Sequence, residues 1–258
     1  MTLQTDDLLT VQDVNVGFGE FVALNGAHLR IARGGITGIV GPNGAGKSTL
    51  FNVLGGQQPH QGGKVMFDGR DITHLPVHRR AQAGLTRTFQ ISRELGALSV
   101  LENLLLAAAA QPGEKLWHAL LNTAAARRCE EQAMEHARSL LERVGLWRLA
   151  HDRADSLSGG QKKLLELCRA LMLKPRLVLL DEPAAGVNPV LVGEIAAFIR
   201  SLQAEGMSFA IVEHNMDMIA ALCDPVYVLA QGSVLTHGSF AEVAANAQVV
   251  EAYLGGVQ

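Results

Sequence analysis

The chain lacks any apolar run long enough to cross a membrane. Apolar residues make up 48% of its 258 residues, yet the densest apolar stretch covers only residues 104–110. A membrane-spanning helix needs about 20 such residues in succession. We therefore expect no direct membrane insertion, and any membrane association has to run through partner proteins.

The sequence also lacks a basic excess and any close pair of cysteines. Its net charge is −3, which argues against a nucleic-acid partner, because such partners usually require a basic face. Cys129, Cys168 and Cys223 lie far apart along the chain and form no C-x-x-C pair of the kind found in zinc or redox sites. Nothing in this pattern points to an oxidising compartment, so we expect a cytoplasmic protein.

Aromatic residues are scarce, at 5%, and the apolar pattern alternates between short strands and helices. Residues 36–40, 177–180 and 208–212 are short apolar runs, as expected for parallel strands that are covered on both faces. Helical spacing separates them and dominates residues 99–145. Alternating strands and helices predict an α/β fold with a mainly parallel sheet.

A glycine-rich motif follows the first of these strands and opens a helix. It fits the pattern G-x-x-x-x-G-K-[ST] in full, and a threonine follows it: Gly41, Pro42, Asn43, Gly44, Ala45, Gly46, Lys47, Ser48 and Thr49. Its backbone N–H groups and the helix N-terminus would bind phosphates. Lys47 would contact the outer phosphates and Ser48 would ligate Mg²⁺. The motif predicts binding and hydrolysis of a nucleoside triphosphate.

Two acidic residues end the second predicted strand. Asp181 and Glu182 directly follow the apolar run 177–180, at the carboxyl end of a strand, where open α/β sheets bind ligands. We expect Asp181 to hold Mg²⁺, directly or through water, and Glu182 to polarise the attacking water. A solvated acidic turn is the alternative for the two residues taken alone, and the phosphate-binding loop favours the site.

A second glycine-containing helix start follows Leu157 and consists of Ser158, Gly159, Gly160 and Gln161. It is a further candidate for anion binding. It cannot easily serve the phosphates of the first loop, because the two would compete for one position. A nucleotide held between two copies of the chain resolves that conflict.

The three motifs together resemble the ATP-binding subunits of ATP-binding cassette (ABC) transporters, over nearly the whole chain. In that family LSGGQ, here 157–161, is the signature that contacts the γ-phosphate of ATP on the opposite subunit. The resemblance implies a P-loop NTPase fold with an N-terminal antiparallel β subdomain and a helical insertion. We expect residues 1–90 and 162–258 to form the ATPase core, and residues 91–161 to form the helical subdomain.

The resemblance also assigns roles to single residues. Phe18 matches the aromatic residue that stacks on adenine, with Phe21 as the alternative. Gln90 matches the glutamine that senses Mg²⁺ and the membrane partner, and His214 matches the histidine that contacts the γ-phosphate. Asn188 stands in the D-loop where an aspartate is common.

Several segments look like the subfamily that serves branched-chain amino acids and related amides. They are residues 86–90, residues 181–189 and the ending 252–255. The long insertion between residues 107 and 135 fits the larger of that system's two ATPase subunits. Gly159 departs from the tyrosine of many members, which keeps urea or amide uptake open as an alternative.

The resemblance implies an ATPase subunit that powers uptake of a small polar solute, with branched-chain amino acids as the first expectation. Its implied partners are two membrane permease subunits, a second ABC ATPase in a homo- or heterodimer and, indirectly, a solute-binding protein. It would lie on the cytoplasmic face of the inner membrane. A lipopolysaccharide-type exporter stays open, while a soluble ABC ATPase of DNA repair or translation is disfavoured by the single cassette.

Overall fold

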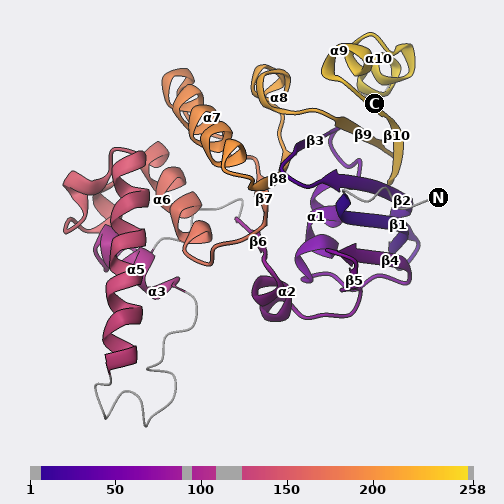
Figure 1. Ribbon diagram of the computed structural model, residues 1–258. Helices are drawn as coiled ribbons and strands as arrows, with labels where there is room; N and C mark the ends of the chain where they lie inside the picture. The colour runs from indigo at the N-terminus through magenta and orange to yellow at the C-terminus, as the bar shows by residue number, and fades with distance from the viewer. Residues whose placement is uncertain (1–6, 89–94, 109–123, 255–258) are drawn as a thin grey trace. The chain divides into compact units, whose positions relative to one another are not determined.

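The structure, a computed structural model, describes residues 7–88, 95–108 and 124–254. The chain divides into two units (Figure 1). The first, called the core unit below, comprises residues 1–90, 176–185 and 195–258. The second, called the helical unit, comprises residues 91–175 and 186–194, and so continues past residue 161.

One sheet of the core unit is antiparallel and has the order β2-β1-β4-β5. Its strands are β1 (Asp7–Phe18), β2 (Phe21–Ala32), β4 (Gly62–Phe67) and the short β5 (Arg70–Asp71). Strand β1 pairs with both β2 and β4. The expected antiparallel N-terminal part is therefore confirmed.

The other sheet has the order β10-β9-β3-β8-β7-β6. All its neighbours run parallel except β9 and β10, which form an antiparallel hairpin. Its strands are β3 (Ile36–Val40), β6 (Leu85–Arg87), β7 (Leu177–Asp181), β8 (Ser208–Val212), β9 (Val226–Ala230) and β10 (Ser233–Gly238). The mainly parallel sheet is as predicted, and β3, β7 and β8 are buried along their whole length.

Helix α1 (Lys47–Gly55) packs against β2 of the first sheet and against β6 and β7 of the second. Its buried apolar side chains, among them Leu50, Phe51 and Leu54, join one core with residues of both sheets. The remaining described helices with residues in this unit are α2 (Val77–Ala83), α7 (Pro189–Ala204), α8 (Met216–Leu222), α9 (Phe240–Ala244) and α10 (Ala247–Leu254).

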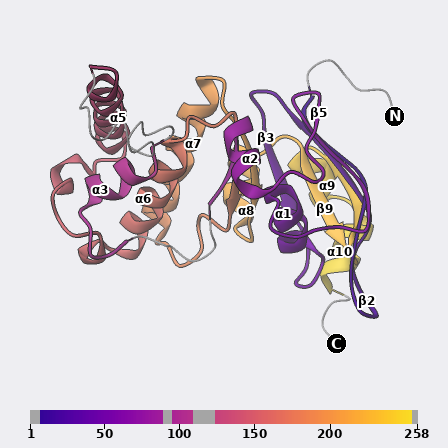
Figure 2. The same ribbon diagram turned by 90° about the horizontal axis from the view of Figure 1, so that it is seen from below.

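The helical unit contains α3 (Val100–Leu106), α5 (Ala124–Arg143) and α6 (Gly159–Leu171). Helix α3 packs against both others, and the three lie together in both views (Figures 1 and 2). A capping box of Ser99 and Glu102 begins α3, with Glu102 N donating to Ser99 Oγ over 3.2 Å. Within the described part of the chain, no helix combines the length and the apolar character that a membrane span needs.

A buried guanidinium closes the carboxyl end of α1. Arg80, on α2, donates to Val53 O over 2.7 Å and to Leu54 O over 2.8 Å, and also reaches the carbonyls of Thr73 and Leu75. The last carbonyls of a helix have no partner within it and carry partial negative charge. Burial lowers the pKa of Arg80 to about 10, so the side chain stays charged at neutral pH and fixes the helix that begins at the glycine-rich loop.

We expect Arg80→Leu to lower the free energy of unfolding by about 2–4 kcal/mol, because the buried carbonyls lose their donors. Urea denaturation followed by circular dichroism measures this. Arg79→Leu is the matched control, since Arg79 is an exposed neighbour whose Nη1 donates to Gln82 Oε1 over 3.2 Å at the surface. It should change stability by less than about 0.5 kcal/mol. Equal losses in the two variants would contradict the helix-closing role.

Candidate nucleotide site

The glycine-rich loop makes a tight turn between β3 and α1. A Cβ added at Gly41 would lie 2.1 Å from the carbonyl oxygen of Leu229, so only glycine fits there. Lys47, the first residue of α1, is buried, and its Nζ donates to Gly41 O over 2.7 Å and to Pro42 O over 2.9 Å. The ammonium is thereby held over the loop, where an ammonium ion still has a third N–H to offer.

A cavity of about 220 Å³ opens beside this loop. Phe21 and Ala23 of β2 line one part of it, and Glu182 and His214 line another. The rest of the lining comes from the loop and the start of α1: Asn43, Gly44, Ala45, Gly46, Lys47, Ser48 and Thr49. The structure thus brings most of the predicted loop residues together with the predicted catalytic pair.

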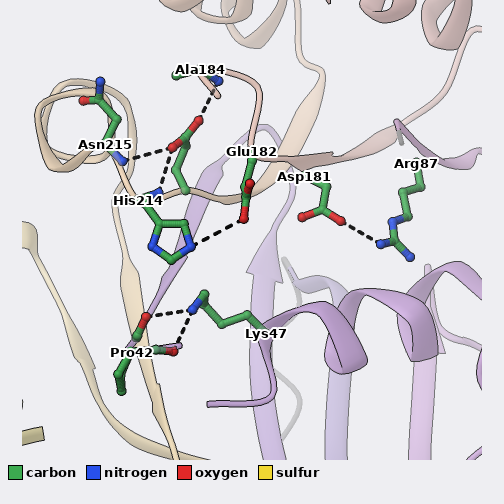
Figure 3. A network of polar contacts seen from close by, with 10 residues as sticks. Pro42, Lys47, Arg87, Asp181, Glu182, Ala184, His214 and Asn215 are labelled. Atoms are coloured by element: carbon green, nitrogen blue, oxygen red, sulfur yellow. Dashed lines mark hydrogen bonds and ion pairs between the residues drawn. The ribbon is translucent and has the colours of Figure 1, made fainter. Parts of the chain in front are cut away.

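Asp181 ends β7 and is almost fully buried. Its Oδ2 accepts from Arg87 Nη2 over 2.7 Å, whereas its Oδ1 is buried without a hydrogen-bond partner among the described residues. In Figure 3 this second oxygen lies on the side of Glu182 and Lys47, away from Arg87. Desolvation lowers the pKa of Lys47 from its ordinary value, and the negative charges of Glu182 and Asp181 oppose that shift.

Glu182 and His214 meet at the same end of the sheet. Glu182 follows β7 with a left-handed backbone (φ 49°), and its Oε1 lies 3.4 Å from Nε2 of His214 (Figure 3). A carboxylate beside an imidazole at the mouth of a phosphate-binding cavity can take a proton from water and orient it. Glu182 was predicted to polarise the attacking water and His214 to contact the γ-phosphate, and both roles remain predictions.

Glu213 holds the two turns that carry this pair. It is 3% exposed, its Oε1 accepts from Ala184 N over 2.6 Å, and its Oε2 accepts from His214 N over 2.7 Å and from Asn215 N over 3.0 Å. One carboxylate therefore ties the segment after Glu182 to the segment that carries His214. Glu213 was not predicted from the sequence, although an acidic residue at the end of a buried apolar run, the signal that identified Asp181, also marks Glu213 after β8.

The two aromatic candidates for adenine stacking differ in position. Phe18 and Phe21 face each other across the end of the β1–β2 hairpin. Phe21 lines the cavity, whereas Phe18 is not among its lining residues. Both side chains are exposed, with Phe21 at 62% and Phe18 at 50%. Stacking by Phe18 stays a prediction, and the geometry places its alternative, Phe21, nearer the phosphate loop.

The predicted signature lies at the start of α6 in the helical unit. Ser158 Oγ accepts from Gln161 N over 3.3 Å, and Gln161 Oε1 accepts from Ser158 N over 2.9 Å, so the two residues form a capping box. Ser158 and Gly159 are exposed, whereas Gly160 is buried. A Cβ at Gly160 would lie 1.8 Å from Leu191 Cδ2, so this glycine allows α6 to pack closely beside the first turn of α7.

The remaining predicted marks are Asn188 and Gln90. Asn188 Oδ1 accepts from Leu191 N over 3.0 Å, immediately before α7 begins at Pro189. Asparagine and aspartate cap a helix N-terminus about equally well, so the departure from the common D-loop aspartate keeps the cap. Gln90 lies outside the described residues.

Two family models match the chain. The model described as ABC transporter covers residues 24–185. The model described as branched-chain amino acid ATP-binding cassette transporter covers residues 233–257.

Curated relatives match the chain over nearly its full length. A probable branched-chain amino acid transport ATP-binding protein LivG of Archaeoglobus fulgidus is 41% identical over 248 residues, which cover 96% of this chain and 95% of the relative. A high-affinity branched-chain amino acid transport ATP-binding protein BraF of Pseudomonas aeruginosa is 37% identical over 96% of this chain and 98% of its own.

Solved structures agree with these relatives. A nucleotide-free ATP-binding cassette from an ABC transporter superposes with a TM-score of 0.83 and 36% identity, over 95% of this chain and 98% of that one. The ADP conformation of an ABC-transporter cassette superposes with a TM-score of 0.84 and 36% identity, over 97% of this chain and 100% of that one.

We expect Glu213→Gln to reduce the turnover of ATP hydrolysis by about 10-fold or more, because the amide NH₂ would face backbone N–H groups and displace the pair by a fraction of an ångström. The free energy of unfolding should fall by about 1–3 kcal/mol. Steady-state kinetics and urea denaturation measure the two effects. Asp217→Asn, at an exposed acidic position on α8, is the control. A variant with wild-type turnover would contradict the positioning role.

We expect Phe21→Ala to weaken ADP binding by about 1–3 kcal/mol, the range of aromatic stacking on a base. Isothermal titration calorimetry measures the affinity, and Phe18→Ala, on the facing residue of the same hairpin, is the matched comparison. Loss of affinity in Phe18→Ala with normal binding in Phe21→Ala would instead support the residue favoured by the sequence resemblance.

Proposed function

The chain belongs to the ABC transporter family of ATP-binding cassettes and is an ATPase, and on this premise we propose that it powers the uptake of branched-chain amino acids. The cavity where the phosphate loop, Glu182 and His214 meet carries the ATPase part of the proposal. The C-terminal match over residues 233–257 supports the choice of subfamily.

Phosphate binding follows from the loop and the helix behind it. The N-terminus of α1 and the backbone N–H groups of the loop give a positive potential that favours anions. Lys47 adds a full charge beside the cavity, and burial makes this charge more effective because less water screens it. These groups together suit the triphosphate of ATP.

The residues present also suit Mg²⁺. Asp181 Oδ1 is buried without a partner among the described residues, and Ser48 lines the cavity. Carboxylate and hydroxyl oxygens are ligands that Mg²⁺ prefers, together with phosphate oxygens of the substrate. When bound, the ion supplies positive charge that neutralises the transferring phosphoryl group. Gln90, the other predicted ligand, stays a prediction from the sequence.

Hydrolysis is assigned to Glu182 and His214. Glu182 would accept a hydrogen bond from the attacking water. As general base it would take the proton of that water while the water oxygen attacks the γ-phosphate. His214, with its Nε2 at 3.4 Å from Glu182 Oε1, would orient the carboxylate and contact the γ-phosphate. Glu213 keeps the two backbones that carry these groups at a fixed separation.

The assembly we propose contains a second ABC ATPase subunit. The exposed helix start at Ser158 and Gly159 would contact the phosphates of ATP held by that partner. Closure of the pair would drive two permease subunits, from the cytoplasmic face of the inner membrane, and a solute-binding protein would deliver the amino acid. The full-length match to single-cassette transport ATPases supports this arrangement.

We expect membrane vesicles that contain the chain with its permeases, second ATPase and binding protein to take up radiolabelled leucine when supplied with ATP. Glu182→Gln should still bind ATP, accumulate a dimer and lose transport, because water is no longer activated. Lys47→Ala should lose nucleotide binding. Glu205→Gln, at an exposed position, is the control and should retain uptake. Uptake of urea without leucine would contradict the proposed substrate.

A further inference from the structure

Arg87 lies within the segment 86–90 that resembles the subfamily, but no role was predicted for its side chain. It ends β6, directly beside β7, and its side chain is 11% exposed. Arg87 Nη2 donates to Asp181 Oδ2 over 2.7 Å. Arg87 Nη1 donates to Asn52 Oδ1 over 2.6 Å and also to Gln57 Oε1.

The three partners of Arg87 belong to two elements of the nucleotide site. Asn52 lies on α1, the helix that begins at Lys47, and Gln57 follows the end of that helix. Asp181, the expected Mg²⁺ ligand, is the last residue of β7. A guanidinium presents its donors in a planar, rigid fork, so the orientation that satisfies α1 also fixes where Asp181 is held. The side chain also lies over the ring of Phe51, with Cζ 5.8 Å from its centroid.

We propose that Arg87 is a positioning residue for the metal-binding carboxylate, holding Asp181 Oδ2 so that Oδ1 points toward the phosphate loop. Oδ1 lies on the loop side in Figure 3 and has no hydrogen-bond partner within the described part of the chain. A carboxylate held by one oxygen cannot rotate freely, so its other oxygen is preorganised for a cation. Residues that hydrogen-bond a metal ligand without touching the metal typically contribute about 10- to 100-fold to metal affinity.

Electrostatic repulsion works in the opposite direction. Arg87 is a cation near the site of another cation, and by charge alone it weakens the binding of Mg²⁺. Its ion pair with Asp181 also offsets part of the negative charge that the carboxylate would present to Mg²⁺. The proposal therefore requires that the gain from orientation exceeds this repulsion, and the sign of the effect of removing Arg87 decides between the two.

The proposal rests on the nucleotide site of the proposed function and concerns only the isolated chain. The test measures binding of Mn²⁺, a spectroscopic substitute for Mg²⁺, to the chain with saturating ADP, by the electron paramagnetic resonance signal of free Mn²⁺. ADP affinity in EDTA is measured separately by calorimetry. Neither readout depends on hydrolysis.

We expect Arg87→Gln to weaken Mn²⁺ binding about 10-fold and to change ADP affinity in EDTA less than twofold. Arg87→Lys should fall between Arg87→Gln and the wild type, because an ammonium can keep Asp181 but cannot hold both elements in one plane. Tighter Mn²⁺ binding in Arg87→Gln would show that repulsion dominates and would overturn the proposal. So would Mn²⁺ and ADP affinities that fall by the same factor, as a general structural role predicts.

Arg176 offers a matched control, at the opposite end of β7 from Asp181. It precedes β7, donates to Asp68 Oδ2 over 2.8 Å and lies over the ring of Phe67 at 5.2 Å. Arg176→Lys should leave Mn²⁺ binding unchanged. If Arg87→Gln does not fold, Gln57→Ala removes one exposed partner of Arg87 and should weaken Mn²⁺ binding about two- to threefold; no change in that variant overturns the proposal.

Failure of this proposal is distinguishable from failure of the proposed function. A chain that binds Mn²⁺ and ADP as described but supports no leucine uptake contradicts the transport substrate alone. A chain that transports leucine while Arg87→Gln binds Mn²⁺ normally contradicts the role of Arg87 alone.

Discussion

The parallel pairing of β3, β8 and β7 is the constraint on which the site depends. Ile39 pairs with Val212, and Val212 pairs with Asp181, so the three strands end side by side at one edge. The glycine-rich loop, His214 and Glu182 each follow one of these ends. No loop has to travel to bring them together, because parallel strands place their carboxyl ends at the same edge.

The same edge concentrates charge in a partly dry environment. Lys47 and Arg87 are cations there, and Asp181, Glu182 and Glu213 are anions. A buried charge is costly unless it is paired or hydrogen-bonded, and most of these groups meet that condition through backbone or side-chain partners. Two atoms of these groups are buried without a hydrogen-bond partner among the described residues, Arg87 Nε and Asp181 Oδ1. Of the two, Asp181 Oδ1 is the atom that the cation chemistry needs. The unmet hydrogen bond is therefore better explained as a ligand position than as a packing defect.

The sequence predicted the parts that depend on local pattern. Strands β3 and β8 match the expected residues 36–40 and 208–212, because a strand buried on both faces is an uninterrupted apolar run with polar or glycine boundaries. Helices α9 and α10 are short and carry weaker signals, and neither was predicted. The unit to which α6 belongs depends on its packing against α3, which no local pattern encodes.

The same distinction explains which site residues were found. The loop and Asp181 belong to motifs whose chemistry is set by neighbours in the chain. Arg87 acts through Asp181, 94 positions away, and Glu213 acts through Ala184, 29 positions away. Such pairs become visible only when the sheet register is known. The choice between Phe18 and Phe21 is of this kind too, because it depends on the path of a hairpin past the phosphate loop.

The exposure of the site bears on how the enzyme works. His214 is 46% exposed and Glu182 21% at the side chain, while Phe21 on the other wall is 62% exposed. Phosphoryl transfer gains from a site closed to bulk water, where fixed charges act with less screening. The predicted catalytic pair, Glu182 and His214, is open to solvent on one side. The helix start at Ser158 is exposed and capped, and we propose that it is the complementary part, which binds phosphate on a partner subunit. A second copy or a similar subunit that supplies such a helix end would close the cavity and add hydrogen-bond donors to the γ-phosphate. Opening would then require loss of the γ-phosphate that both subunits hold.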